Sequence, residues 1–446
     1  MLRTLRFLPL AAWLSLCGSA FADGAASSRN AAHLVQAVLG ELPGVAAVGV
    51  LRQGKIVVAV RRRERMGSPL ETVDVAGAPG AEPIFEVGSV SKVFTGLLVA
   101  QRVERGELRL EDTIGELLEG KVPFRYEIAS TIRVRQLVTH ASCLPRWPAG
   151  FTEARMFEQA GEYGSAGLWA LMGRFVLGRQ PPCETRYSNL GYAVLGEMMA
   201  VRAQQPWESL FVEEIARPLA LHDTRARLSS AQQQRLAPAW NGGVRSKPWD
   251  AGVFAPAGGL RSTATDLLVF SQALLQGRKG PLGASAERLV TDLAAFGENG
   301  TRIGYGVLMP QAPLRTWIHN GETRAYKAEW IVWPDSQEAV VILASNKAAP
   351  TERVRRELVA GTWSGAVQEV VYTRGEFRGS FEEDGGRRLY ARVKLAPGSK
   401  IPFSTLTYRV PDRTLVAGLS AGTAVEFRAE RIDGENTITA MRPASK

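Results

Sequence analysis

The sequence predicts an α+β, or layered α/β, domain followed by a small all-β module. Strand-like stretches stand near both ends of a long region of helices and Gly/Pro-rich loops: "VAAVGVLRQGKIVVAV" at 45–60 and "TWIHNGETRAYKAEWIVWPDSQEAVVILASNK" at 316–347. Strands from both ends of one domain imply an antiparallel sheet that both ends complete, with helices packed on it. From about residue 370 only short strands and turns follow, which predicts a barrel of about 75 residues.

The elements of the larger domain follow in order. Apolar residues at 34, 38 and 42 predict a helix that ends at Pro43-Gly44. Gln53-Gly54 predicts the turn of a β-hairpin between the first two strands. A helical pattern runs from Ser89 to about Leu110. Near the other end, a turn is expected at Pro334-Asp335, followed by a closing helix in "APTERVRRELVAGTW".

The amino-terminal segment is typical of a secretory signal. Basic "MLRTLR" precedes the apolar run "FLPLAAWLSLCGSAFA", which ends in the small-x-small site Ala20-Phe21-Ala22. A transmembrane anchor is the alternative, but the run is short of the roughly 20 residues that a spanning helix needs. Leu16 before Cys17 argues against lipoprotein cleavage. We therefore expect a periplasmic protein with a signal peptide at 1–22, a main domain at 23–365 and the barrel at 370–446.

The charge balance does not indicate a nucleic-acid partner. The formal net charge is +10, and signal cleavage would remove Arg3 and Arg6 and leave +8. The densest basic cluster, "RRRER" at 61–65, follows the strand-like "KIVVAV" and has no interleaved aromatic residues of the kind that stack on bases. We interpret it as the solvated end of a strand. After signal cleavage no membrane-spanning segment is expected, and no feature indicates an oligomeric state.

The stretch "FEVGSVSK" at 85–92 raises the first chemical question. A serine hydroxyl becomes a good nucleophile when a nearby base takes its proton. Ser89 and Lys92 are three residues apart, so on a helix their side chains can meet. Burial and the positive end of the helix would lower the pKa of Lys92. The alternative is a capped helix with a surface lysine, because S-x-x-K alone is common by chance.

Two further motifs decide between these interpretations. "RYSNLGYAVLGEMM" contains Tyr187 and Asn189 as Y-x-N, and "WIHNGET" contains His319 and Gly321 as H-x-G. With "FEVGSVSK" they stand in the order found in penicillin-recognising serine hydrolases, namely class C β-lactamases, low-molecular-weight D,D-peptidases and related esterases. "RQLVTHASCLP", "RPLALHDT" and "PAGGLRSTATDLLVF" resemble further landmarks of that family. The resemblance covers about residues 30 to 360 and implies the β-lactamase/transpeptidase-like fold.

The resemblance also implies a role for each motif residue. Ser89 would attack a carbonyl and form an acyl-enzyme, while Lys92 and Tyr187 would share the proton transfers. Asn189 would hold the substrate's amide and fix Lys92. The backbone N–H groups of Ser89 and Glu322 would bind the oxyanion.

His319, in the third motif, would orient or help bind the substrate's carboxylate end. The other histidines, His33, His140 and His222, are expected to be structural. After the third motif the family often has glycines and an aromatic residue, whereas this chain has Arg324 and Ala325. Arg324 would either bind a substrate carboxylate or be a rim charge.

The sequence indicates neither a metal nor a cofactor. No H-E-x-x-H motif, paired C-x-x-C motif or Asp/His cluster at ligand spacing is present. "GLSAG" at 418–422 matches the G-x-S-x-G elbow of α/β-hydrolases, but the strand-like "TAVEF" follows it where that motif needs a helix. We expect a β-turn there.

The expected function is that of a periplasmic serine hydrolase acting on D-alanyl-D-alanine peptidoglycan peptides and acylated by β-lactams. The first alternative is a class C-like β-lactamase, and the next is an esterase. The rival from another class is an inactive binding protein that senses wall fragments. It would need a broken catalytic residue, whereas Ser89, Lys92, Tyr187 and Asn189 are all present.

The carboxy-terminal module resembles the small OB-fold copper chaperones of periplasmic cation efflux. In that family two methionines in the stretch matching "IPFSTLTYRV" bind the metal, together with a histidine and a tryptophan. Here Ser404 and Leu406 stand at the methionine positions, and no histidine follows His319. These side chains cannot replace soft thioethers for Cu(I). We expect a metal-free barrel that serves as a docking or wall-binding accessory.

Two cysteines remain after signal cleavage, Cys143 in "THASCLP" and Cys183 in "QPPCETRYSN". The resembled family commonly has glycine at the first position and often at the second, in loops that flank the active site. An oxidising compartment favours a structural disulfide between them. Two independent buried thiols are the alternative.

Overall fold

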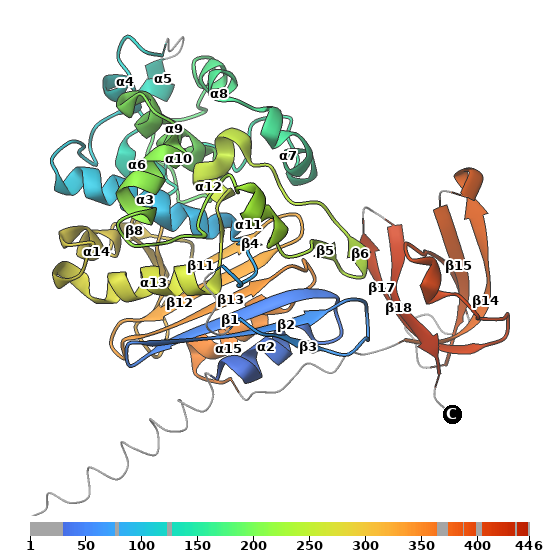
Figure 1. Ribbon diagram of the computed structural model, residues 1–446. Helices are drawn as coiled ribbons and strands as arrows, with labels where there is room; N and C mark the ends of the chain where they lie inside the picture. The colour runs from blue at the N-terminus through green and yellow to red at the C-terminus, as the bar shows by residue number, and fades with distance from the viewer. Residues whose placement is uncertain are drawn as a thin grey trace, which may run out of the picture.

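The computed structural model describes residues 30–75, 80–122, 127–363, 373–386, 388–397, 404–432 and 435–444. The predicted signal peptide at 1–22 lies outside these residues. Figure 1 shows a sheet with helices on both faces and a separate small barrel at the carboxy-terminal end. Within the described part of the chain, no helix is long and apolar enough to cross a membrane.

The central sheet has nine strands in the order β3-β2-β1-β13-β12-β11-β10-β9-β8. The predicted hairpin is β1 (Gly44–Arg52) and β2 (Lys55–Arg63). β1 pairs antiparallel with β13 (Glu338–Ala344), so Val48 lies opposite Ile342. The two ends of the domain therefore complete one antiparallel sheet, as the sequence predicts. The remaining strands are β3 (Glu71–Val73), β8 (Ala294–Ala295), β9 (Arg302–Ile303), β10 (Leu308–Met309), β11 (Trp317–Glu322) and β12 (Lys327–Trp333).

The sheet separates two hydrophobic cores because successive strand residues face opposite sides. On β1, Ala47 belongs to the core under the large helical region, and Val48 belongs to the core under α2 (Ala31–Leu39) and α15 (Thr351–Ala360). α15 is the predicted closing helix. The helices of the large region are α3 (Ser91–Glu104), α4 (Ile114–Leu117), α5 (Glu127–Ser130), α6 (Val134–Val138), α7 (Glu153–Gln159), α8 (Ser165–Met172), α9 (Asn189–Ala203), α10 (Trp207–Phe211), α11 (Ser230–Gln234), α12 (Ala255–Gly258), α13 (Ala264–Leu275) and α14 (Ala284–Leu289).

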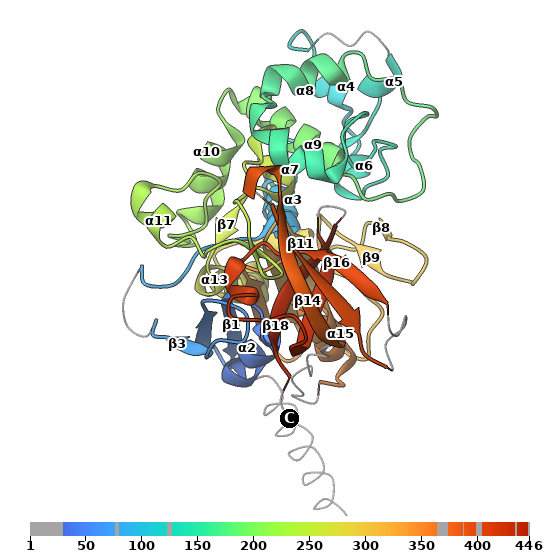
Figure 2. The same ribbon diagram turned by 90° about the vertical axis from the view of Figure 1, so that its right-hand side faces the viewer.

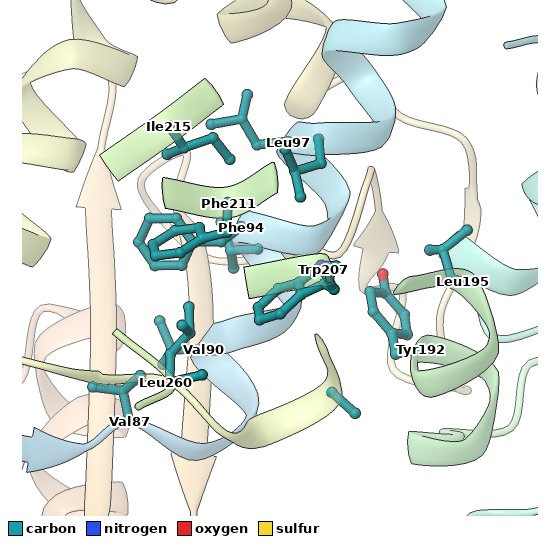
Figure 3. Packing of buried hydrophobic residues seen from close by; sticks show 14 of the residues in the cluster. Val87, Val90, Phe94, Leu97, Tyr192, Leu195, Trp207, Phe211, Ile215 and Leu260 are labelled. Atoms are coloured by element: carbon teal, nitrogen blue, oxygen red, sulfur yellow. The ribbon is translucent and has the colours of Figure 1, made fainter. Parts of the chain in front are cut away.

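α3 is buried along most of its length and anchors the helical region. Figure 3 shows Phe94 of α3 against Phe211 of α10, and their rings meet edge to face with centroids 5.5 Å apart. The helix is shorter than predicted. It starts at Ser91, after a 3-10 turn at Gly88–Val90, and it ends at Glu104. Gly106, at φ 72°, provides the left-handed residue that commonly follows a helix end.

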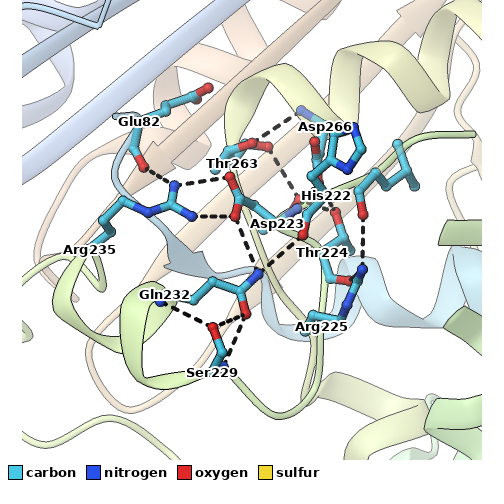
Figure 4. A network of polar contacts seen from close by, with 12 residues as sticks. Glu82, His222, Asp223, Thr224, Arg225, Ser229, Gln232, Arg235, Thr263 and Asp266 are labelled. Carbon is cyan, nitrogen blue, oxygen red and sulfur yellow. Dashed lines mark hydrogen bonds and ion pairs between the residues drawn. The ribbon is translucent and has the colours of Figure 1, made fainter. Parts of the chain in front are cut away.

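A polar network fixes the segment after α10 to the start of α13 (Figure 4). Asp266 accepts hydrogen bonds from the Asp223 N–H and from the Thr224 hydroxyl, both at 2.8 Å. Arg235 forms an ion pair with Asp223. The network orients the short strand β7 (Arg261–Ser262), which pairs with β4 (Phe85–Glu86) directly before Ser89.

The carboxy-terminal module is a closed barrel of five strands in the order β14-β15-β16-β18-β17. The strands are β14 (Thr373–Glu383), β15 (Arg388–Leu395), β16 (Thr405–Arg409), β17 (Ala424–Ile432) and β18 (Glu435–Pro443). Its own core includes Phe377, Val393 and Phe427. Residues 418–422, the "GLSAG" stretch, lie between a 3-10 turn and β17, so the α/β-hydrolase elbow is excluded there.

The barrel lies beside a small hairpin of the large domain, formed by β5 (Trp240–Asn241) and β6 (Val244–Arg245) (Figure 1). Figure 2 shows the molecule from the side of the barrel, with β14 and β18 toward the viewer. A Cβ added at Gly243 in this hairpin would lie 2.6 Å from the carbonyl oxygen of Thr439 on β18. The close approach of the two backbones therefore requires glycine at position 243.

Candidate active site

Ser89 lies in the 3-10 turn that leads from β4 into α3. The neighbouring Ser91 fixes this turn, because its hydroxyl donates to the Gly88 carbonyl at 2.7 Å and accepts from the Leu260 N–H at 3.0 Å. The N-cap of α3 is Val90. Ser89 is therefore not the helix cap, and its hydroxyl is available for other contacts.

The amino group of Lys92 is completely buried and faces three oxygen atoms. Nζ lies 3.1 Å from Ser89 Oγ, 2.7 Å from Asn189 Oδ1 and 2.5 Å from the Ala257 carbonyl oxygen. Burial lowers the pKa of Lys92 well below its usual value, and the positive charge of Arg146 lowers it further. The expected meeting of Ser89 and Lys92 is present, and this lysine is not on the surface.

Tyr187 and Asn189 reach the same point from the start of α9. Ser188 is the N-cap of this helix and accepts from the Gly191 N–H at 2.8 Å. The cap directs the two flanking side chains toward Lys92, whose Nζ lies 4.7 Å from the centre of the Tyr187 ring. Burial raises the pKa of Tyr187 far above its usual value, and the neighbouring Ser89 hydroxyl opposes this effect only in part.

The rings of two buried histidines lie close to the ring of Tyr187. The ring centre of His140 lies 4.6 Å from that of Tyr187, and the ring centre of His319 lies 6.5 Å from it. Burial lowers the pKa of His319 to about 3 and that of His140 well below its usual value, with Lys92 adding to both effects. Both imidazoles are therefore neutral at neutral pH. His319 Nδ1 lies 2.7 Å from the Asn320 carbonyl oxygen and donates to it, so Nε2 is an acceptor.

β11 passes so close to the turn carrying Ser89 that two glycines are required. A Cβ on Gly321 would lie 1.8 Å from the Val87 carbonyl oxygen and 3.0 Å from the Ser89 nitrogen. A Cβ on Gly88, which has φ 51°, would lie 2.6 Å from the Glu322 nitrogen. The backbone nitrogens of Ser89 and Glu322 thus belong to a 3-10 turn and a strand in direct contact, an arrangement suited to a pair of oxyanion donors.

Charged side chains border the site beyond Glu322. The Glu322 carboxylate pairs with Lys347 at 2.5 Å, and Arg324 pairs with Glu158 of α7 at 3.6 Å. Arg324 also lines a cavity of about 710 Å³, together with the basic side chains of Arg245 and Lys247 and the acidic side chains of Glu158 and Glu162. Arg324 is therefore placed at the edge of an open, charged cavity next to Glu322.

No group of three or more His, Cys, Asp or Glu side chains within the described ranges is arranged to hold a metal ion. The chemistry that this arrangement can perform is proton transfer and nucleophilic attack by a hydroxyl, supported by backbone N–H donors.

A family model described as Beta-lactamase matches residues 31–362. The chain belongs to the beta-lactamase family. Penicillin-binding protein 4 of Amycolatopsis lactamdurans is 28% identical over 224 residues, which cover 45% of this chain and 53% of that protein. The D-alanyl-D-alanine-carboxypeptidase/endopeptidase AmpH of Escherichia coli is 26% identical over 219 residues, covering 48% of this chain and 54% of that protein. The chain thus spans about half the length of these curated relatives.

The fold is also shared with solved structures of other proteins. A beta-lactamase/D-alanine carboxypeptidase from Yersinia pestis superposes with a TM-score of 0.62 and 17% identity, over 78% of this chain and 97% of that one. A D-stereospecific amidohydrolase from Streptomyces superposes with a TM-score of 0.60 and 21% identity, over 75% of this chain and 99% of that one. The predicted fold class and the resemblance to penicillin-recognising enzymes are confirmed at the level of the family.

Sequence reasoning missed several groups around Lys92. His140 was expected to be structural, and the packing of its ring on Tyr187 was not predicted. Arg146 has its guanidinium 5.4 Å from the centre of the same ring. The Ala257 carbonyl, which accepts from Lys92, is a backbone atom with no sequence signature of its own. Only the position of "THASCLPRW" between the first two motifs could have indicated His140 and Arg146.

The predicted disulfide between Cys143 and Cys183 is present, with the two Cα atoms 5.3 Å apart. It joins the loop after His140 to the loop before Tyr187. Backbone hydrogen bonds reinforce the junction, because Cys183 N–H donates to the Ala141 carbonyl and Arg186 N–H donates to the His140 carbonyl, both at 2.9 Å. The bond therefore restrains the two loops that carry His140 and Tyr187.

We predict that replacing both cysteines by serine destabilises the protein. The bond closes a loop of 40 residues, for which chain entropy predicts a loss of about 4 kcal/mol. The free energy of unfolding in urea, measured for the native protein and for the C143S/C183S variant, tests this. Equal unfolding free energies for the two proteins would contradict the prediction.

Proposed function

We propose that the protein is a serine hydrolase that acts through an acyl-serine intermediate. Its substrates would be peptidoglycan peptides ending in D-alanyl-D-alanine, and β-lactams would acylate it. The single observation that carries the proposal is the buried Lys92 amino group 3.1 Å from Ser89 Oγ. A buried amine with a lowered pKa beside a serine hydroxyl is a base positioned to activate a nucleophile.

Lys92 would act as the base that takes the Ser89 proton. A neutral amine has two N–H groups and one lone pair. The N–H groups can donate to Asn189 Oδ1 and to the Ala257 carbonyl, which leaves the lone pair for the Ser89 hydroxyl. Ser89 Oγ then bonds to the substrate carbonyl carbon while its proton moves to Lys92, and the backbone N–H groups of Ser89 and Glu322 bind the oxyanion.

Tyr187 would deliver a proton to the leaving group. Because burial raises its pKa, the side chain holds its proton as a phenol in the free protein. A phenol next to Lys92 can donate to the leaving nitrogen and recover a proton from the newly formed ammonium of Lys92. Lys92 and Tyr187 would thus share the proton transfers, as the family resemblance implies.

The remaining predicted residues would bind the substrate. Asn189 would hold the substrate's amide group, and neutral His319 would accept a hydrogen bond through Nε2 close to Gly321. The positive charge for a terminal carboxylate would then come from Arg324, whose ion pair with Glu158 at 3.6 Å lies at the border of the charged cavity.

The names of the relatives support a wall peptide as substrate, since they include a penicillin-binding protein and a D-alanyl-D-alanine carboxypeptidase/endopeptidase. A class C-like β-lactamase is the alternative within the same chemistry, because a class C beta-lactamase from Rhodobacter sphaeroides shares the fold with a TM-score of 0.58. The two differ in how fast water removes the acyl group. We further propose a periplasmic location and an accessory, wall-binding role for the barrel, in which Ser404 and Leu406 replace the metal-binding methionines of the copper chaperones.

We predict that a fluorescent penicillin labels Ser89. Labelled protein should carry the reagent on the peptide containing this residue, as mass spectrometry of a digest would show, and S89A should remain unlabelled. S336A, at an exposed serine in the β12–β13 turn, serves as the control that keeps full labelling.

The lifetime of the label distinguishes the candidate functions. Stable label together with release of D-alanine from a peptide indicates a peptidase, and rapid turnover of label indicates a β-lactamase. Cleavage of esters without label would favour an esterase. A native protein that neither labels nor cleaves any of these compounds would contradict the enzymatic proposal.

We also predict that acylation slows at low pH. Burial lowers the pKa of Lys92, so its neutral form is lost as the pH falls through this lowered pKa, and kcat/KM falls with it. The midpoint should lie well below the usual lysine value of about 10.4. K92R, which stays protonated, should lose about a hundredfold or more of the rate, whereas K279R at an exposed lysine should keep the native profile. A midpoint at or above the usual lysine value, or a K92R variant with native activity, would contradict Lys92 as the base.

A further inference from the structure

Glu86 is a buried carboxylate that the proposed chemistry does not use. It lies on β4, three residues before Ser89, and only 3% of its surface is exposed. A buried carboxylate is costly unless donors surround it. The hydrogen-bond donors around Glu86 therefore identify the segments of the site that this side chain connects.

One oxygen of Glu86 reaches the turn after β11. Oε2 accepts from the Thr323 hydroxyl at 2.7 Å, and Thr323 directly follows Glu322. The Thr323 hydroxyl in turn accepts from the Tyr326 N–H at 3.2 Å. Glu86 thus fixes the turn that positions the Glu322 N–H beside Ser89.

The other oxygen reaches the opposite side of the site. Oε1 accepts from the Trp249 N–H at 2.6 Å and lies 3.5 Å from the Arg261 guanidinium, which also donates to the Trp249 carbonyl at 2.6 Å. The Trp249 ring lies against Gly258, where an added Cβ would be 3.1 Å from the ring. The preceding residue, Ala257, provides the carbonyl that accepts from Lys92.

We propose that Glu86 is a positioning residue that sets the oxyanion donors and the Lys92 base relative to Ser89. Through its bond to Thr323 it holds the adjacent Glu322 N–H in place. Through its bond to Trp249, whose ring packs on α12, it holds the Ala257 carbonyl that accepts from Lys92. The inference rests on the proposed serine-hydrolase function. It assigns Glu86 no contact with substrate and no proton transfer of its own.

A second buried carboxylate provides a matched control. Glu329 on β12 is also 3% exposed, accepts from the Thr351 hydroxyl at 2.9 Å and pairs with Arg355 at 2.8 Å. Burial raises the pKa of both Glu86 and Glu329 to about 7. Thr351 and Arg355 belong to α15, on the face of the sheet opposite the large helical region, so Glu329 has the same chemistry at a different place.

The experiment measures the rate constant for acylation by a fluorescent penicillin and the dissociation constant of the complex that precedes it. We expect E86Q to lower the acylation rate constant by about tenfold to a hundredfold, because small displacements of reacting groups cost this much, with little change in the dissociation constant. T323V, which removes one bond and leaves the carboxylate, should show the same kind of loss, and T323S should restore the rate. E329Q should lose stability in thermal melting but keep the native acylation rate.

Each result has a clear meaning. Native protein that is not acylated at all would contradict the proposed function. If native protein is acylated, then native rates in both E86Q and T323V overturn the inference about Glu86. A loss in E329Q as large as that in E86Q, or a T323S variant as slow as T323V, also overturns it. If E86Q does not fold, the comparison of T323V with T323S still decides the question.

Discussion

The burial of one amino group is the constraint around which the site is organised. Lys92 is completely buried, and an amine can leave water only if acceptors surround it or if it loses its charge. Three elements provide its partners: the 3-10 turn with Ser89, the start of α9 with Asn189, and α12 with the Ala257 carbonyl. These segments are far apart in the sequence. One turn further along α3, the Thr95 hydroxyl donates to the Pro256 carbonyl at 2.7 Å and holds α12 against α3.

The sheet supplies the second half of the site. β11 lies inside the sheet, between β12 and β10, so its position is set by strand pairing on both sides. The turn with Ser89 then lies directly on β11, at a distance that permits only glycine at positions 88 and 321. The proposed oxyanion donors therefore come from two elements in direct contact, the turn with Ser89 and β11. Preorganised donors of this kind are what acyl transfer requires.

Much of this arrangement could be predicted from the sequence, because the informative features were local. The Gln53-Gly54 turn, the closing helix and the strands at both ends follow from turn chemistry and hydrophobic period. The order of three motifs led to the site. Two cysteines at positions where the resembled family often has glycine, in an expected oxidising compartment, led to the disulfide. What could not be predicted depends on tertiary contacts. The 3-10 turn before α3, the Ala257 carbonyl and the ring of His140 behind Tyr187 have no local signature. Glu86 is a single charged residue in an apolar stretch, and only its partners 163 and 237 residues away show why it is buried.

The central claim is that Lys92 is a neutral amine next to Ser89 in the free protein. The most direct test is a pH titration of the lysine side-chain carbon signals by NMR, with the Lys92 signal assigned from the K92R variant. We expect this signal to titrate well below the usual value of about 10.4, so that the amine is already neutral where the other lysines are still charged. A Lys92 signal that titrates at or above the value of the surface lysines would contradict the account, because the buried group would then be an ammonium and Ser89 would lack its base.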